Sequence, residues 1–246
     1  MDALPKSAKR IRIKALVALS MAFAAGCVDI IGYISFGRVF TAHMTGTTVH
    51  LGEHLVHGNW WKALEMAAML VSFVGGSVVG RAVIEVGSRW RLRSIAAVPL
   101  MLEAFLIAIA IPSGWHQLIA LVLLASAMGV QTATLTRVGS LTIHTTFVTG
   151  MLNKLAQLLS HVSFLTYDAS RHVEGAVSAR RKVLLEARFI FGVWFLYTLG
   201  AVIGTWMKLR WGVPALILPA ALISMLAILD LVSPLAIQEE RDQSER

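Results

Sequence analysis

Apolar stretches with about the length of a membrane-crossing helix recur along the chain, separated by short polar segments. Six of them are expected to cross the bilayer: residues 15–36, 66–80, 95–111, 118–136, 189–207 and 213–229. A helix needs about 20 residues to cross a hydrocarbon core roughly 30 Å thick. Pro112, Ser113 and Gly114 favour a turn and separate the third stretch from the fourth. The pattern predicts an all-α integral membrane protein with about six transmembrane helices.

Two further segments, residues 39–57 and 143–164, fit this pattern less well. They are moderately apolar but rich in threonine, glycine and histidine. Each contains a Thr-Gly pair where a lipid-facing helix would have leucine. We interpret both segments as broken or re-entrant helices. The alternative is that both of them cross the membrane, which would give eight spans.

The distribution of basic residues favours six spans. Basic clusters precede the first span, follow the second span and follow segment 143–164: Lys6, Lys9, Arg10, Arg12 and Lys14; Arg81, Arg89, Arg91 and Arg93; Arg171, Arg180, Arg181, Lys182 and Arg188. If neither half-polar segment crosses, all three clusters lie on one side, as is typical of cytoplasmic loops. If both segments cross, the second cluster is exported. We therefore expect six spans with both termini in the cytoplasm.

Three landmarks recur in the same order in the two halves of the chain. Residues 76–80 and 200–204 both begin and end with glycine, and Gly26 and Gly129 precede the two Thr-Gly pairs at similar distances. We interpret the four glycines of the two pentapeptides as helix-packing residues. A three-span unit reverses its orientation when it is duplicated, so we expect two inverted repeats. The expected division is a basic N-terminal segment (1–14), a first repeat (15–112), a second repeat (118–231) and a charged tail (238–246), within one membrane domain.

Candidate pathway residues surround the two Thr-Gly pairs. They are Thr41, Thr45, Gly46, Thr47 and Thr48 in the first segment, and Thr145, Thr149, Gly150 and Asn153 in the second. A break in a helix frees backbone groups, and because lipid offers them no partners, hydroxyls, water or a ligand must satisfy them. The alternative is that each threonine only bonds the carbonyl four residues before it.

Ionisable side chains within spans are costly and therefore point to function. Asp29 lies well inside the first span, and we keep two roles for it: a proton or cation site, or a structural partner of Arg38 or Arg137. Glu103 lies midway along the third span. We keep two roles for it as well: a neutral hydrogen-bond donor, or a proton carrier. Both acids join the candidate pathway residues. Asp230, near the end of a span, is expected to be solvated.

Composition excludes several classes of protein. The chain is 57% hydrophobic and 15% charged, whereas soluble domains have roughly 25% charged residues. A lone cysteine, Cys27, excludes an intrachain disulfide framework. The net charge of +8 lies in loops beside spans, so it indicates orientation in a lipid bilayer and not a nucleic-acid partner.

Three histidines and a glutamate after the first Thr-Gly pair fit a different chemistry. His50, Glu53 and His54 match the H-x-x-E-H string of one class of zinc protease, and His57 is one turn further on. On a helix the three histidines share a face, so a metal-binding intramembrane enzyme is an alternative. The second repeat has no such residues, and we expect a polar or interfacial helix face with no metal.

Two motifs resemble those of a known family. They are Gly26-Cys27-Val28-Asp29 and Met44-Thr45-Gly46-Thr47-Thr48-Val49-His50-Leu51-Gly52, and Thr145-Thr146-Phe147-Val148-Thr149-Gly150 resembles a third element. They resemble the Gly-x-Val-Asp and Met-Thr-Gly-Asn-Thr-Val-x-Leu-Gly motifs of the YoaK-like family, with Thr47 where the family has Asn. The resemblance covers nearly the whole chain. It implies a multi-pass protein of the bacterial inner (plasma) membrane, and members are often described as permeases of unknown function.

These observations lead to an expected function. We expect a transporter or permease of an unidentified small solute or ion, with its pathway between the two Thr-Gly segments. No enzyme activity, cofactor or nucleic-acid partner is expected, and a homo-oligomer stays open. The alternatives are the metal-binding enzyme and a membrane scaffold or sensor without transport.

Overall fold

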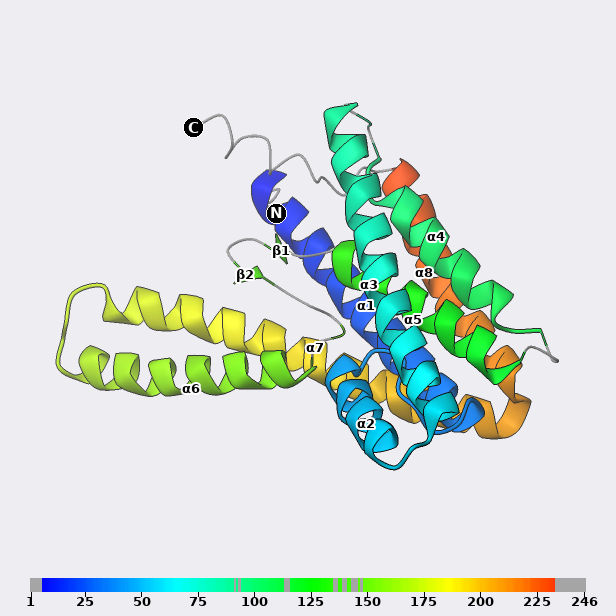
Figure 1. Cartoon of the computed structure of the whole chain (residues 1–246). Coiled ribbons are helices and arrows are strands. Elements are labelled where there is room, and N and C mark those ends of the chain that lie inside the picture. The colour runs from blue at the N-terminus through cyan, green and yellow to red at the C-terminus, as the bar shows by residue number, and fades with distance from the viewer. Residues whose placement is uncertain are drawn as a thin grey trace.

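The computed structural model describes residues 6–90, 92, 94–112, 116–134, 137–138, 141–142, 146 and 148–232. Within these residues the chain is helical apart from one small hairpin (Figure 1). The helices are α1 (Lys6–Ser35), α2 (Met44–Val56), α3 (Trp60–Arg89), α4 (Ala97–Ile109), α5 (Gln117–Thr134), α6 (Val148–Ser170), α7 (Ala176–Trp211) and α8 (Ile217–Val232). A 3-10 turn, η1 (Val213–Leu216), leads into α8, and β1 (Arg137–Val138) pairs antiparallel with β2 (Leu141–Thr142).

Most of the long helices are apolar enough to cross a membrane. Five candidate spans lie in α1, α3, α5, α7 and η1 with α8, which confirms a membrane protein. The third expected span, residues 95–111, holds only the apolar 13-residue helix α4. A helix of that length covers about 20 Å, which is less than the roughly 30 Å of a hydrocarbon core.

The first helix begins earlier than the expected division of the chain. The basic segment 1–14 is not separate from the first span, because α1 already begins at Lys6 and continues to Ser35. Hydrophobic patterning alone does not find this start, because basic side chains can continue a helix beyond the membrane. The expected tail, residues 238–246, lies outside the described residues.

Glycines bring the long helices together in two close pairs, α1 with α7 and α3 with α5. A Cβ added to Gly26 would meet the carbonyl oxygen of Tyr197, and one added to Gly76 would meet that of Ser126. Gly200 and Gly129 are equally tight, against the carbonyls of Phe23 and Phe73. The expected packing role of residues 76–80 and 200–204 is confirmed.

Each of these two pairs is parallel. On α3 and α5, Gly76 lies beside Ser126 and Gly80 beside Val130, so residue numbers rise together along both helices. On α7 and α1, Gly200 lies beside Phe23 and Gly204 beside Cys27, so residue numbers again rise together along both helices. Figure 1 shows that α4, which follows α3 and precedes α5 in the sequence, runs in the opposite direction to both and lies beside α5 and α8. The chain therefore returns along the bundle through α4 before α5 begins.

The short helix α4 packs against α8, and Asp230 joins their ends. The N–H of Ala97, in the first turn of α4, donates to Asp230 Oδ2 at 2.9 Å. The hydroxyl of Ser94 donates to the carbonyl of the same aspartate at 2.9 Å. Asp230 is buried, so the expectation that it is solvated is wrong. Its carboxylate is occupied because free N–H groups at a helix start need an acceptor.

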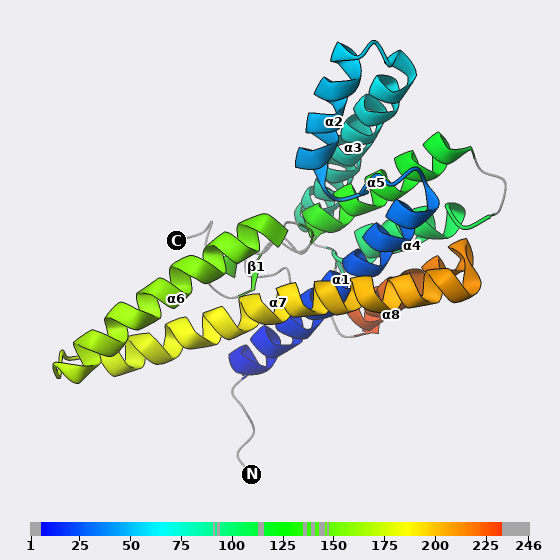
Figure 2. The same ribbon diagram turned by 90° about the horizontal axis from the view of Figure 1, so that it is seen from below.

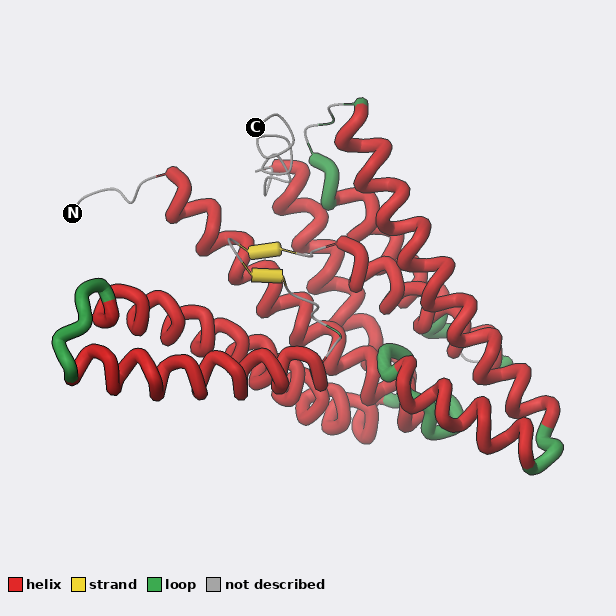
Figure 3. The backbone as a smooth tube through the Cα atoms, turned by 60° about the vertical axis from the view of Figure 1, so that its left-hand side comes forward, coloured by secondary structure: helices red, strands yellow, loops and turns green. Residues whose placement is uncertain are grey.

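Two helical hairpins project from the bundle. One consists of α2 and the first part of α3, the other of α6 and the first part of α7 (Figures 2 and 3). In all three views α2 and α6 begin near each other and run apart. The fold therefore places the two segments that contain the Thr-Gly pairs next to each other at the base of the hairpins.

Two adjacent glycines of α3 test the close pairing of helices. Gly76 packs against the α5 backbone, whereas a Cβ added to Gly75 would have nothing within 4 Å. We expect Gly76→Ala to lower the free energy of unfolding by about 1–3 kcal/mol, because the two backbones must move apart. Gly75→Ala is the matched control and should raise it by about 0.5–1 kcal/mol. Unfolding in mixed micelles measures both, and equal stabilities would contradict the packing.

Candidate functional site

The carboxylate of Asp29 is the centre of a buried polar cluster. Oδ1 accepts hydrogen bonds from the Thr41 N–H at 2.7 Å, the Thr41 hydroxyl at 3.0 Å and the Ala42 N–H at 3.0 Å. Oδ2 accepts from the Tyr197 hydroxyl at 2.6 Å and from His43 Nδ1 at 3.1 Å. Asp29 is 2% exposed, so five donors satisfy a side chain that has almost no contact with solvent. The cluster joins α1, α7 and the segment before α2.

The chain reaches Asp29 by turning back after α1. Gly37 and Arg38 have positive φ angles of 76° and 57°, and the rings of Tyr33 and Phe40 stack with their centroids 4.3 Å apart. The returning segment meets Asp29 six residues before Ser35, roughly 9 Å back along the helix axis. The segment that leads into α2 is therefore held against the side of α1, back from its C-terminal end.

The second half of the chain holds the start of α6 in a similar way. Thr132 on α5 and Thr146, just before α6, have their hydroxyl oxygens 2.7 Å apart. Thr132 donates its own proton to the Met128 carbonyl at 2.8 Å, so Thr146 is the donor between the two threonines. Thr132 follows Gly129 by three residues, as Asp29 follows Gly26. A hydroxyl therefore stands where the first half has a carboxylate.

The Thr-Gly pairs lie at helix starts and not at breaks inside helices. Thr45-Gly46 belongs to the first turn of α2, and Thr149-Gly150 to the first turn of α6. Thr45, Gly46, Thr149 and also Asn153 are exposed, and Gly150 is half-buried. The described part of the chain thus leaves most of the polar groups at these two helix starts uncovered.

The remaining candidate threonines have local partners. The hydroxyls of Thr47 and Thr48 donate to the carbonyls of His43 and Met44 at 3.3 and 2.8 Å, which is the local bonding left open above. Thr41 is buried against Asp29. Thr145 lies outside the described residues.

Asp29 has no arginine partner among the described residues. Its donors are backbone, hydroxyl and imidazole groups, and no ion pair joins it to Arg38. The side chain of Arg137 lies outside the part of the chain described.

Glu103 belongs to a different environment. It is fully buried on the face of α4 that also carries Leu100, Ala104 and Ile107. Neither carboxyl oxygen has a hydrogen-bond partner among the described residues, so a neutral donor finds no acceptor there. Among the described residues, Glu103 makes no hydrogen bond to the Asp29 cluster, and the structure does not bring the two acids together as one site.

The three histidines of α2 do share a face, but they bond within that helix. His50 Nδ1 lies 3.0 Å from Glu53 Oε2, and His57 Nδ1 lies 2.8 Å from the Glu53 carbonyl. The hydrogen bond from His50 lowers the pKa of the exposed Glu53 below its ordinary value. Among the described residues, no group of three or more His, Cys, Asp or Glu side chains could hold a metal ion. The metal-enzyme alternative therefore lacks a described ligand set.

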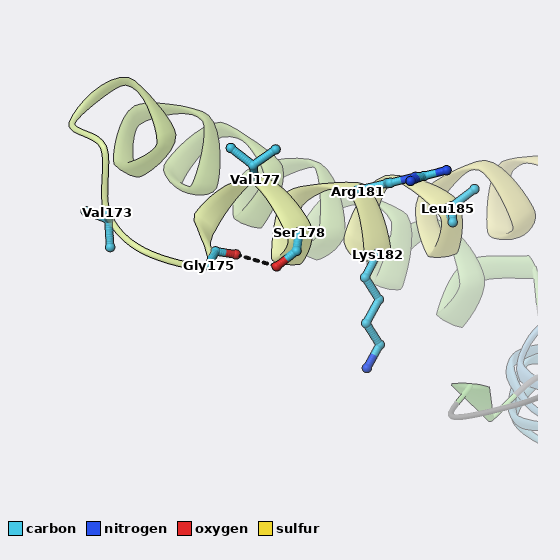
Figure 4. A pocket seen from close by; sticks show the side chains of 7 residues that line it. All are labelled: Val173, Gly175, Val177, Ser178, Arg181, Lys182 and Leu185. Carbon is cyan, nitrogen blue, oxygen red and sulfur yellow. Dashed lines mark hydrogen bonds between the residues drawn. The ribbon is translucent and has the colours of Figure 1, made fainter.

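An open pocket at the tip of the α6–α7 hairpin offers no convergent chemistry. In Figure 4 the side chains of Arg181 and Lys182 point apart, and the Ser178 hydroxyl donates to the Gly175 carbonyl at 2.8 Å. Its polar groups are directed at the helix end or outward, so the Asp29 cluster is the stronger candidate site.

Two members of that cluster were missed from the sequence, His43 and Tyr197. His43 directly precedes the Met44-Thr45-Gly46 motif, and this position could have signalled its role. Tyr197 lies 168 positions from Asp29, and only its place three residues before Gly200 connects it with the repeat. The hydrogen bond with Asp29 raises the pKa of His43 above its ordinary value, because a carboxylate partner favours the protonated ring.

The two buried acids of α4 and α8 give opposite predictions. Glu103→Leu should raise the free energy of unfolding by about 1–3 kcal/mol, since it removes a buried carboxyl without a described partner. Asp230→Leu is the control and should lower it by about 1–2 kcal/mol, because it removes the acceptor for the Ala97 N–H. Thermal unfolding in detergent measures both. A Glu103→Leu variant less stable than wild type would contradict the assignment.

Comparison with known proteins supports the resemblance noted in the motifs. Residues 17–229 match the family described as protein of unknown function (DUF1275). The chain is 28% identical over 188 residues to the UPF0700 transmembrane protein YoaK of Bacillus subtilis (strain 168), covering 74% of this chain and 79% of that relative. No solved structure matches the chain. The chain therefore belongs to the DUF1275 family of YoaK-like membrane proteins.

Proposed function

We propose that this protein is an inner-membrane transporter or permease for a small solute or ion, with its pathway between the starts of α2 and α6. The observation that carries the proposal is the matched tethering of these two helix starts. Asp29 holds one and Thr132 the other, each three residues after a glycine that packs against a neighbouring helix. Uncovered polar groups at helix starts within a membrane need water or a ligand, because lipid offers no partners.

We infer six crossings in two inverted repeats, an arrangement that suits this pathway. Parallel pairing of α3 with α5 requires the chain to cross between them, and α4 is the described helix that connects them. With α4 as a crossing, each half has three spans and one helix that is not counted as a span, the 13-residue α2 or the 23-residue α6. Pro99 and Pro219 occupy the third position of α4 and α8, and both are buried, as expected for corresponding helices. Inverted repeats with such helices are typical of secondary transporters.

The same arrangement supports a cytoplasmic location for both termini. With six crossings, the start of α1, the α3–α4 connection and the tip of the α6–α7 hairpin lie on one side. The described basic residues at these three places include Lys14, Arg89 and Arg181. Positive residues are retained in the cytoplasm, so this side faces the cell interior.

Cysteine labelling tests whether the two helix starts line an aqueous pathway. Cys27 is the sole cysteine, so Cys27→Ser provides a background without reactive thiols that keeps a donor to the Gly200 carbonyl. In the Cys27→Ser background, Thr45→Cys and Thr149→Cys should react with a charged methanethiosulfonate at least about tenfold faster than Val74→Cys. The reactive species is the thiolate, which forms in water and not in lipid. Val74 is the lipid-facing control, 59% exposed near the middle of α3. Equal, slow labelling of all three variants would refute the pathway.

Reconstituted proteoliposomes test transport itself. The probes are labelled rubidium, chloride, amino acids and monocarboxylates. Thr45→Leu and Thr149→Leu should each reduce the uptake that wild type shows by about tenfold, since leucine replaces an uncovered hydroxyl. Val74→Leu is the control and should keep wild-type uptake. Unchanged uptake in both threonine variants would overturn the proposed site.

A further inference from the structure

We propose that His43 is the proton-binding residue of this pathway and that Asp29 is its fixed counter-ion, positioned by Tyr197. Coupling of a proton to transport rests on the proposed function, whereas proton binding at His43 does not. The proposal starts from the Asp29–His43 contact of 3.1 Å and from the different exposure of the two side chains. Asp29 is 3% exposed at its side chain and His43 is 41% exposed.

The contacts of Asp29 suit a permanent carboxylate. Every described partner of its two oxygens is a donor: two backbone N–H groups, two hydroxyls and an imidazole N–H. A cation would need several oxygen ligands, whereas the two hydroxyl oxygens at this carboxylate, of Thr41 and Tyr197, both donate hydrogen bonds to it. A proton on either oxygen would compete with a donor already present. Asp29 therefore acts as a positioning residue.

His43 can take up the proton that Asp29 does not. Because Asp29 is an acceptor only, Nδ1 of His43 carries the hydrogen of their bond and Nε2 keeps its lone pair. Nε2 has no hydrogen-bond partner among the described residues, and the ring is half-exposed beside Phe40. A proton from water binds this lone pair and converts the imidazole into an imidazolium. The Nδ1–H bond to Asp29 stays in place throughout.

Protonation changes the net charge of the cluster from −1 to zero. Among the described residues, the titratable group bonded to His43 is Asp29 from α1, and the one bonded to Asp29 in turn is Tyr197 from α7; the first turn of α2, Met44 to Thr47, carries no charged side chain. A neutral ion pair is easier to enclose in a low-dielectric membrane than a lone carboxylate. Proton binding can thereby favour a closed arrangement of the pathway. The raised pKa of His43 keeps it protonated at higher pH than a free histidine.

The second half shows that tethering alone does not require this chemistry. There Thr132 and Thr146 hold the start of α6 with hydroxyls, and Phe73 lies against Gly129 as Tyr197 lies against Gly26. Counted back from the two Thr-Gly pairs, Phe147 takes the place of His43 in the sequence, and the nearby His144 lies outside the described residues. Among the described residues, the acid, the histidine and the tyrosine hydroxyl are brought together in the first half. Holding a helix start does not itself require these groups, because two threonine hydroxyls are bonded at the start of α6.

Histidine NMR tests the proposal on the whole protein in nanodiscs. With ring-labelled histidine, the signal lost in His43→Gln identifies His43, and His161 on α6 is the control. We expect neutral His43 to carry its proton on Nδ1. We also expect Asp29→Asn to weaken its proton affinity by at least about tenfold, or about one pKa unit. His161 should not change.

A second variant keeps the test decisive if Asp29→Asn does not fold. Tyr197→Phe removes one donor from Asp29 Oδ2, so the carboxylate attracts imidazolium more strongly and the proton affinity of His43 should rise. A proton on Nε2 of neutral His43, or an unchanged affinity in the folded variants, would overturn the proposal. If NMR supports proton binding but the threonine variants transport normally, the proposed pathway fails while the proton site stands.

Discussion

The close approach of parallel helices at glycines is the constraint on which the rest of the molecule depends. Gly76 and Gly129 bring the α3 and α5 backbones into contact, and Gly26 and Gly200 do the same for α1 and α7. Two helices that are parallel neighbours cannot be joined by a short turn, so the connecting chain must travel back along them. This requirement gives the 13-residue helix α4 its direction across the bundle, although its length alone would not identify it as a span.

The same glycine contacts determine where the polar chemistry can be placed. Asp29 and Thr132 each follow a glycine by three residues, so each lies almost one turn beyond a point of close packing. At Asp29 this brings in Tyr197 from α7, and the turn at Gly37 brings in the backbone of Thr41. The helix pair and the turn back are thus both needed to satisfy the buried carboxylate.

Sequence reasoning was most successful where the signal is local. Mean hydropathy identified five of the spans, and the spacing of glycines identified the positions where helices pack closely. Sequence reasoning failed for Asp230. The carboxylate of Asp230 accepts a hydrogen bond from the N–H of Ala97, which lies 133 positions away in the sequence. The Thr-Gly pairs were located correctly, but a glycine does not distinguish a broken helix from a helix start. That difference depends on the preceding segment, which is held by Asp29 in one half.

The starts of α2 and α6 are held by different chemistry. A pair of threonine hydroxyls holds the start of α6, so a neutral contact is sufficient for that mechanical task. Burying a carboxylate in the same place is more costly, because the ion loses its hydration, and five donors are arranged around Asp29 to offset that loss. Four of these donors cannot change charge when the pH varies near neutrality. The fifth, His43, can, and its ring is the member of the cluster that extends furthest toward solvent. With the role proposed for His43, the start of α2 would respond to protons, whereas the hydroxyl contact at the start of α6 would remain a fixed support.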